Sequence, residues 1–312
     1  MQTILITGAA GFIGSSLADA LISKYRVICI DNFNDYYDPA IKESNIQQIK
    51  DNKNYTLYPA DICDENAMSD IFNRNSIDMV IHLAARAGVR PSIEEPTLYM
   101  ETNVTGTSVL LNLCQKHGIK KFIFASSSSV YGALKEGPFS EDMAVANTIS
   151  PYAASKVAGE VLCQTFANLY KMNIVALRFF TVYGPRQRPD LAINKFTNLI
   201  KEGKPIPVYG DGTTQRNYTY IDDIVDGIIR CFDYNEKPYE VFNLGGDETV
   251  SLSELISTIE KALGKTAIIN RLPDQPGDVP LTHANIDKLR NAVGYQPSTD
   301  IVAGINKYIN SL

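Results

Sequence analysis

The first 178 residues alternate between short apolar runs and longer segments in which apolar residues recur at helical spacing. Buried strands are indicated by the apolar runs at 2–6, 26–30, 55–59, 79–81, 121–125 and 174–178. Helices are indicated by the amphipathic segments at 13–23, 65–75, 96–117 and 151–171. Parallel strands need crossover connections, which helices usually provide. The pattern therefore predicts an α/β fold, a doubly wound parallel sheet of six strands with the Rossmann architecture.

After residue 178 the pattern becomes less regular. Prolines and glycines cluster at 184–185, 205–212 and 273–280. Shorter helices are predicted at 191–202, 221–233, 251–263 and 300–310. We expect residues 1–178 to form a nucleotide-binding domain and residues 179–312 to form a smaller C-terminal α/β domain for the substrate, with some segments that return to the first domain.

Composition and charge narrow the class of protein. The 312 residues carry a net charge of −6, which disfavours nucleic acid and anionic membranes as partners. The five cysteines are widely spaced without a Cys-x-x-Cys pair, so neither a disulfide framework nor a metal site is expected. The N-terminus does not resemble a signal peptide, and no apolar run approaches the ~20 residues that span a bilayer. We expect a cytoplasmic protein that acts away from membranes.

A glycine-rich turn separates the first strand from the first helix. Gly8, Gly11 and Gly14 have the spacing G-x-x-G-x-x-G. Glycines at these places allow a tight turn and let the bare backbone approach a pyrophosphate at the helix N-terminus. We count Phe12 and Ile13, which lie between the glycines, among the predicted cofactor contacts. This stretch predicts dinucleotide binding.

The second strand ends at Asp31, about 20 residues after Gly11, where a carboxylate can accept hydrogen bonds from the adenosine ribose. A carboxylate also repels a 2′-phosphate, and neither Asn32 nor Phe33 supplies a compensating cation. The sequence therefore predicts NAD rather than NADP. His82, at the end of the fourth strand, is expected to pack or form hydrogen bonds beneath the sheet. Further cofactor contacts are predicted at Asn32, Asp61, Ile62, Leu83, Ala84, Ala85 and Asn103.

A Tyr-x-x-x-Lys pair stands at the start of the helix that follows the fifth strand. Ser150 is a good N-cap and Pro151 a good first helical residue, so the helix is expected to begin here. Tyr152 and Lys156 then leave the same face of the helix. An ammonium beside a phenol lowers a pKa that starts near ~10, which would make Tyr152 a base for a hydroxyl proton. Taken alone, the spacing is also that of an ordinary surface pair.

Motifs in a fixed order extend this pattern over essentially the whole chain. They are T-G-A-A-G-F-I-G at 7–14, H-L-A-A at 82–85, S-S-S-S-V-Y-G at 126–132, P-Y-A-A-S-K at 151–156, R-F-F-T-V-Y-G-P at 178–185 and R-N-Y-T-Y-I-D-D at 216–223. The chain thereby resembles the extended short-chain dehydrogenase/reductase superfamily, which contains the nucleotide-sugar epimerases. It is most similar to the UDP-glucuronate 4-epimerases at D-N-F-N-D-Y-Y-D-P (31–39), A-R-A-G-V-R (85–90), R-Q-R-P-D (186–190) and Q-P-G-D-V-P-L-T-H-A-N-I (275–286).

The resemblance implies an NAD-dependent isomerase acting on a UDP-sugar. Tyr152 would be the base, Lys156 its partner on the nicotinamide ribose, and Ser127 the hydroxyl that bonds the reacting oxygen. The sugar would be oxidised at C4, turn over as a 4-keto sugar and recover its hydrogen on the other face. NAD would lie on residues 1–178 and the UDP-sugar on residues 179–312. Relatives dimerise through the helices that correspond to 97–117 and 151–170, which implies a homodimer.

The residues before Val-Tyr-Gly separate the chemistries of the superfamily. Dehydratases carry an acidic pair there and decarboxylases a glutamate, whereas this chain has Ser128 and Ser129. A glucuronate carboxylate would then be held by the hydroxyls of Ser128, Ser129 and Thr181. Arg188 would be its bidentate partner. The alternative for Arg188 is a surface position beside Asp190.

At the nucleotide end the resemblance implies Arg216 on the diphosphate, Lys195 as a second cation and Asp278 on the uridine ribose. Arg86, in the loop after the fourth strand, would touch the sugar or the diphosphate, or pair with nearby acids. Gln275 stands where some relatives have an arginine, which places more of the diphosphate binding on Arg216.

Other functions remain open on the sequence alone. One is a 4-epimerase of the same mechanism that acts on UDP-glucose or UDP-N-acetylglucosamine. A decarboxylase or a dehydratase is opposed by the neutral Ser128 and Ser129. A non-catalytic NAD-responsive binding protein is opposed by the intact set of Ser127, Tyr152 and Lys156, because a sensor has no use for a phenolate base.

Overall fold

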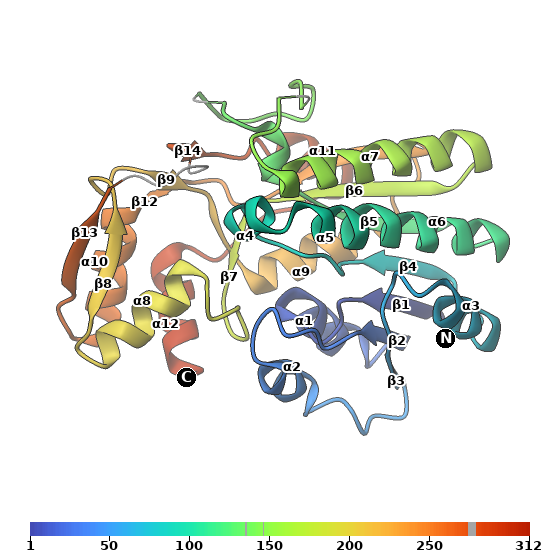
Figure 1. Cartoon of the computed structure of the whole chain (residues 1–312), viewed down its shortest axis with the longest axis horizontal. Coiled ribbons are helices and arrows are strands. Elements are labelled where there is room, and N and C mark those ends of the chain that lie inside the picture. The colour runs from blue at the N-terminus through green and yellow to red at the C-terminus, as the bar shows by residue number, and fades with distance from the viewer. Residues whose placement is uncertain (135, 146, 274–278) are drawn as a thin grey trace.

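The computed structural model describes residues 1–134, 136–145, 147–273 and 279–312. Its centre is a seven-stranded parallel sheet in the order β11-β6-β5-β4-β1-β2-β3 (Figure 1). The strands are β1 (Thr3–Thr7), β2 (Arg26–Asp31), β3 (Tyr55–Pro59), β4 (Met79–His82), β5 (Lys121–Ser127), β6 (Asn173–Phe179) and β11 (Tyr239–Leu244). Because β1 lies between β2 and β4, the strand order reverses there, and a ligand crevice is expected at its carboxyl end.

Two hydrophobic layers cover the two faces of this sheet. Ile4 and Ile6 belong to one core and Leu5 to the other, as the alternation of side chains along a strand requires. The first face is covered by α1 (Phe12–Leu21), α2 (Pro39–Ile46) and α9 (Ile221–Arg230). The second face is covered by α3 (Glu65–Arg74), α6 (Gly106–Lys116) and α7 (Pro151–Tyr170). The doubly wound α/β fold predicted from the pattern is confirmed.

The C-terminal half adds three small sheets and further helices. Two strand pairs, β7 with β10 and β8 with β13, stand beside a three-stranded sheet in the order β12-β9-β14. The strands are β7 (Thr181–Tyr183), β8 (Pro205–Tyr209), β9 (Gln215–Arg216), β10 (Tyr218–Tyr220), β12 (Val250–Ser251), β13 (Ile268–Leu272) and β14 (Leu281–Thr282). The remaining helices of this half are α8 (Ala192–Lys201), α10 (Leu252–Leu263), α11 (Asp287–Val293) and α12 (Ile301–Asn310). In Figure 1 the small sheets with α8, α10 and α12 lie beyond one end of the main sheet.

The main domain differs from the prediction in its strands and in its helices. The sheet has a seventh strand, since β11 pairs with β6 in parallel register, and α9 packs on α1. Segments after residue 178 therefore return to the first domain. The helix predicted over 96–117 is divided into α5 (Pro96–Met100), a π-helical turn η1 (Glu101–Thr105) and α6. The short helix α4 (Val89–Glu94), which was not predicted, precedes it.

Over the described ranges, no helix has both the length and the apolar character that crossing a bilayer requires.

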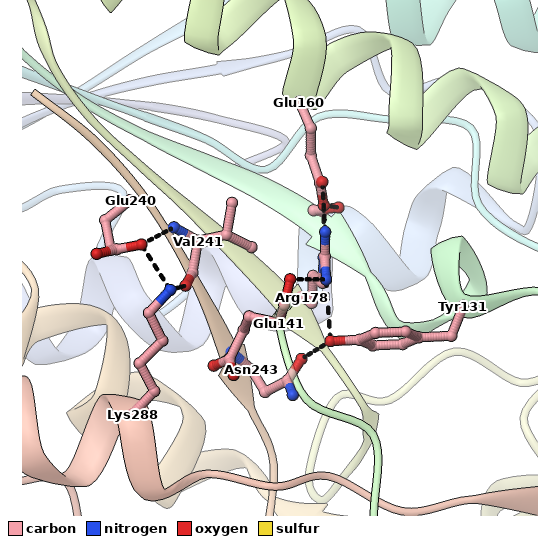
Figure 2. Close-up of polar contacts among 9 residues, drawn as sticks. Tyr131, Glu141, Glu160, Arg178, Glu240, Val241, Asn243 and Lys288 are labelled. Atoms are coloured by element: carbon pink, nitrogen blue, oxygen red, sulfur yellow. Dashed lines mark hydrogen bonds and ion pairs between the residues drawn. The ribbon is translucent and has the colours of Figure 1, made fainter. Parts of the chain in front are cut away.

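A buried polar network connects α7, β6 and β11 and so joins the N-terminal and C-terminal halves of the chain (Figure 2). Arg178, at the end of β6, donates from Nε and Nη2 to the carboxylate of Glu160 on α7, at 2.9 and 2.8 Å. Its Nη1 donates to the hydroxyl of Tyr131 at 3.0 Å. Tyr131 in turn donates to Asn243 Oδ1 on β11 at 2.7 Å. The catalytic helix predicted from the sequence is thus tied to the strand that returns from the C-terminal half.

Candidate active site

A cavity of about 520 Å³ lies at the carboxyl ends of the parallel strands. Its walls come from the segments that follow β1, β2, β3 and β4 and from the ends of β5 and β6. This is the crevice in which doubly wound folds bind their ligands. Most of the predicted cofactor residues line it, namely Gly8, Gly11, Phe12, Ile13, Gly14, Asp31, Asn32, Asp61, Ile62, Leu83, Ala84 and Ala85.

Two of the glycines are required by close backbone contacts. Gly8 has φ +69°, and a Cβ on it would lie 2.8 Å from the backbone nitrogen of Ala84. A Cβ on Gly14 would lie 2.2 Å from the carbonyl oxygen of Gly8, so the first turn of α1 packs directly on the loop. The backbone of this loop is therefore bare where a pyrophosphate would approach it.

Asp31 lines the cavity and has a cation, Lys42, close to its carboxylate. Lys42 was not predicted from the sequence. Its carboxylate accepts the backbone N–H of Ala10 at 3.1 Å and that of Phe33 at 2.9 Å. Lys42, on α2, has its Nζ 3.8 Å from Asp31 Oδ1, and both side chains are about 5% exposed. Burial lowers the pKa of Lys42, while Asp31 acts in the opposite direction. Lys42 also donates to the backbone carbonyl of Asn34 at 3.0 Å, which fixes it in place.

Asn103, which was predicted as a cofactor contact, lies behind the cavity wall and not in it. It is 2% exposed and does not belong to the cavity wall. The π-helical turn η1 directs its amide to the loop after β4, where it bonds both the N–H and the C=O of Arg86 at 2.8 and 2.9 Å. Its Nδ2 also donates to Ser155 Oγ on α7 at 2.9 Å. Asn103 thus holds the loop that lines the cavity, and Arg86 itself belongs to the wall.

Ser127, Tyr152 and Lys156 meet in this cavity. Helix α7 begins as predicted, with the Ser150 hydroxyl accepting the N–H of Ala153 at 3.1 Å. Lys156 Nζ donates to the carbonyl oxygen of Ala125 at 2.8 Å and lies 5.9 Å from the centre of the Tyr152 ring. The three side chains are therefore brought together from two elements, β5 and α7.

The pKa of Tyr152 is not lowered as the Tyr-x-x-x-Lys spacing suggested. Burial raises it, because a phenolate loses more hydration than a phenol. A hydrogen bond with Ser127 and the positive charge of Arg188 act in the opposite direction, whereas Lys156 is turned toward a carbonyl. Burial lowers the pKa of Lys156 itself to about 8. Arg188 thus offsets part of the effect of burial on the Tyr152 phenol.

The residues predicted to hold a carboxylate are also gathered here. Ser128, Ser129, Thr181 and Arg188 line the cavity together with Tyr152. Arg188 belongs to the cavity wall and also forms a bidentate ion pair with Asp190, at 2.9 and 2.8 Å.

The nucleotide-end residues are not brought into the cavity. Lys195 is exposed on α8, and Arg216, on β9, donates to the carbonyl oxygen of Gln215 at 2.9 Å. Neither belongs to the cavity wall. Asp278 and Gln275 lie outside the described residues.

A tyrosine cluster beside the predicted catalytic pair, Tyr152 and Lys156, was missed. The Tyr99 ring meets that of Tyr152 edge to face at 6.3 Å, and its hydroxyl donates to the carbonyl of Ala87 at 2.8 Å. Tyr36 interacts with Tyr99 and lines the cavity. Only the D-N-F-N-D-Y-Y-D-P motif could have pointed to Tyr36.

His82 is buried and forms hydrogen bonds, as predicted. Its Nδ1 is 2.7 Å from Thr7 Oγ1 and its Nε2 is 3.0 Å from Thr107 Oγ1. The ring is 1% exposed, and burial, assisted by the charge of Lys156, lowers its pKa to about 3. His82 is therefore a neutral structural residue.

Comparison with known proteins agrees with this geometry. The NAD dependent epimerase/dehydratase family matches residues 4–245, which include the glycine-rich turn and α7, the helix of Tyr152 and Lys156. The chain belongs to that family. That family is NAD dependent, and the residues in the wall suit NAD, with a bare glycine loop and the carboxylate of Asp31 at the end of β2.

Individual relatives of this epimerase/dehydratase cover its whole length. It is 42% identical to a UDP-glucuronate 4-epimerase of Thermodesulfobacterium geofontis over 99% of this chain and 96% of that one. It is similar to the Bacillus cereus UDP-glucuronic acid 4-epimerase solved with UDP-glucuronic acid and NAD, with a TM-score of 0.94, 38% identity and coverage of 99% and 98%. It is also similar to the UDP-glucose 4-epimerase of Thermotoga maritima solved with UDP-glucose, with a TM-score of 0.92, 32% identity and the same coverage.

Proposed function

We infer that this chain is an NAD-dependent UDP-glucuronate 4-epimerase, which interconverts UDP-glucuronate and UDP-galacturonate. The observation that carries the inference is the common wall formed by Ser128, Ser129, Thr181 and Arg188 beside Tyr152. Neutral hydroxyls and one cation suit a sugar carboxylate. The T. geofontis and B. cereus relatives, which bear this function in their names, support it.

The reaction divides into a proton transfer and a hydride transfer. Bound NAD supplies a reversible hydride acceptor for C4 of the sugar. Tyr152 removes the proton of the 4-hydroxyl and later returns it, and Ser127 bonds the same oxygen. Lys156 is assigned to the nicotinamide ribose. The hydrogen bond with Ser127 and the charge of Arg188 both favour the ionised form of Tyr152, which the base must reach.

Retention of the carboxylate is a second requirement of this chemistry. Once C4 is a ketone, the sugar is a β-keto acid, and it loses carbon dioxide if the carboxylate bond stands perpendicular to the carbonyl plane. Hydroxyls from Ser128, Ser129 and Thr181 can hold the carboxylate away from that geometry, and Arg188 can stabilise its charge. The serines also leave no carboxyl group at the two positions where dehydratases and decarboxylases carry theirs.

The UDP portion is assigned to the C-terminal part of the chain, residues 179–312. We propose that Arg216 and Lys195 bind the diphosphate, that Asp278 binds the uridine ribose and that Arg86 reaches the sugar or the diphosphate. Asn103 would act on cofactor binding through the Arg86 loop that it holds.

A homodimer in the cytoplasm is part of the proposal. Val161 and Leu169 on α7 are 57% and 65% exposed, and Met100 on the neighbouring α5 is 38% exposed, so an apolar helical face is available for a second copy. The cysteines support a reducing compartment, since all five are unpaired and four of them are buried.

The test is product analysis by NMR after incubation with UDP-glucuronate, and separately with UDP-glucose. UDP-galacturonate as the product of the first reaction supports the proposal. Turnover of UDP-glucose alone would favour the second candidate, a UDP-glucose 4-epimerase, which the T. maritima structure supports. A UDP-pentose would indicate a decarboxylase.

A further inference from the structure

The guanidinium of Arg188 has two edges that can each bind a carboxylate, and one of them is already occupied. A guanidinium offers five N–H donors in a fixed planar fork. Asp190 takes the side edge, with Arg188 Nε 2.9 Å from Oδ1 and Nη2 2.8 Å from Oδ2. The end edge, formed by Nη1 and the second hydrogen of Nη2, is not used by this pair.

The face of the same guanidinium is also supported. Arg188 Cζ lies 5.3 Å from the centre of the Tyr36 ring, within the range of a cation–π contact. Tyr36 is linked to Tyr99, whose ring meets Tyr152. The plane of Arg188 is therefore set by an aromatic ring that belongs to the catalytic cluster, and its rotation in that plane is set by Asp190.

Burial and charge distinguish the two partners. The side chain of Arg188 is 20% exposed and lines the cavity, whereas that of Asp190 is 48% exposed and is not part of the wall. The charge of Arg188 and the hydrogen bonds that it donates hold the pKa of Asp190 below its usual range, so Asp190 is a carboxylate at neutral pH. Arg188 in turn acts electrostatically on Tyr152 inside the cavity.

We propose that Asp190 is a positioning residue for substrate specificity, which holds Arg188 by its side edge so that the end edge is presented to the C6 carboxylate of the sugar. The proposal rests on the proposed function, because it assigns Arg188 to that carboxylate. A long arginine side chain loses conformational freedom when it binds. Asp190 has already ordered it, so an acidic sugar gains a charged hydrogen-bonding edge without that loss. A neutral C6 alcohol gains much less from the same edge.

A competing effect has the opposite sign and makes the proposal testable. Asp190 and a sugar carboxylate would both be anions on one guanidinium, and their repulsion weakens the binding of an acidic sugar. If orientation dominates, loss of Asp190 lowers the preference for the acidic sugar. If repulsion dominates, loss of Asp190 raises that preference. We take orientation to dominate, since Asp190 is half exposed and its charge is screened by water.

The experiment measures kcat/KM for UDP-glucuronate and for UDP-glucose and takes their quotient as the acid-to-neutral ratio. It is done on the holoenzyme of the wild type and of five variants: Asp190→Ala, Asp190→Asn, Asp190→Glu, Arg188→Ala and the double variant Arg188→Ala/Asp190→Ala. We expect Asp190→Ala to lower the acid-to-neutral ratio by about five- to tenfold through KM for UDP-glucuronate, the scale of a half-exposed charge-assisted hydrogen bond. Asp190→Asn, which keeps one acceptor, should have a smaller effect, and Asp190→Glu should restore most of the ratio. Asp226→Asn, which removes the ion pair with Arg230 on α9 outside the cavity, is the matched control and should leave the ratio unchanged.

The proposed function and the role of Asp190 are contradicted by different results. Wild-type protein that does not epimerise UDP-glucuronate would remove the proposed function. If it does, and Arg188→Ala lowers the ratio while Asp190→Ala leaves it unchanged or raises it, the positioning role of Asp190 is wrong. In the double variant, loss of Asp190 should add nothing to Arg188→Ala, and additive effects would also contradict a role exerted through Arg188.

Discussion

Glu160 Oε2 lies 2.8 Å from Arg178 Nη2, and Glu160 stands one helical turn after Lys156 on α7. The second oxygen of Glu160 accepts the hydroxyl of Ser126, the residue before Ser127. One buried carboxylate on the helix that carries Lys156 therefore bonds the end of β5, which carries Ser127, and the end of β6. The ion pair fixes the position of α7 on the sheet (Figure 2).

Removing the cation of this pair should destabilise the protein strongly. The side chains of Arg178 and Glu160 are 4% and 7% exposed, so Arg178→Met leaves a buried carboxylate without its partner. We expect the free energy of unfolding in denaturant to fall by about 3–5 kcal/mol. The pair of Arg74 and Asp70 is about 70% exposed, and Arg74→Met should change the same quantity by less than about 0.5 kcal/mol. Equal losses in the two variants would contradict a structural role for the buried pair.

Removing the phenol oxygen of Tyr152 should stop the reaction without removing the cofactor. Tyr152→Phe keeps the ring and its contact with Tyr99, while the group that accepts the proton is lost. Turnover of UDP-glucuronate, followed by NMR, should become undetectable. The amount of NAD released on denaturation should match that of the wild type. Substantial remaining turnover would show that another residue is the base.

The buried histidine should control stability between pH 5 and 6.5. Unfolded His82 takes up a proton below about 6.5, whereas the folded residue stays neutral until about 3. The unfolded state then binds more protons, so the free energy of unfolding should fall with decreasing pH by up to about 1.4 kcal/mol per pH unit. The chain has three histidines, and of these only His82 is buried. His82→Gln should flatten the slope, and an unchanged slope would contradict the assignment.

The apolar face of α7 should carry the dimer contact. Leu169→Glu places a charge on that face, and we expect it to convert a dimer to a monomer in light scattering coupled to size exclusion. Val302→Glu is the control, because Val302 is 55% exposed but lies on α12. Dimerisation that survives Leu169→Glu and is lost in Val302→Glu would place the interface elsewhere.

The parts of the fold that the sequence predicted are those with a continuous local signal. The six predicted strands are short apolar runs, whereas β11 was missed because Glu240 interrupts its apolar pattern. One partner of that carboxylate, Lys288, lies far along the chain. The π-helical turn at Asn103 was missed for a similar reason. Its amide bonds Arg86 in the loop after β4. Because Arg86 lies outside 96–117, the apolar periodicity of that segment gives no sign of the contact.

The same distinction between local signals and tertiary contacts applies to the residues of the site. Motif residues such as Gly8, Tyr152 and Arg188 could be named from spacing and resemblance. Lys42 could not, because it reaches Asp31 from α2 through a contact between elements. The sign of the Tyr152 pKa shift also required the structure, since it depends on burial and on which way Lys156 points.

Reversible oxidation at C4 with return of the same hydrogen is the central claim. The direct measurement is epimerisation of UDP-glucuronate that carries deuterium at C4, in ordinary water, with the product read by NMR and mass spectrometry. We predict UDP-galacturonate with the deuterium retained at C4 and the carboxylate intact. Loss of the label to solvent, or a UDP-pentose as the main product, would contradict the account.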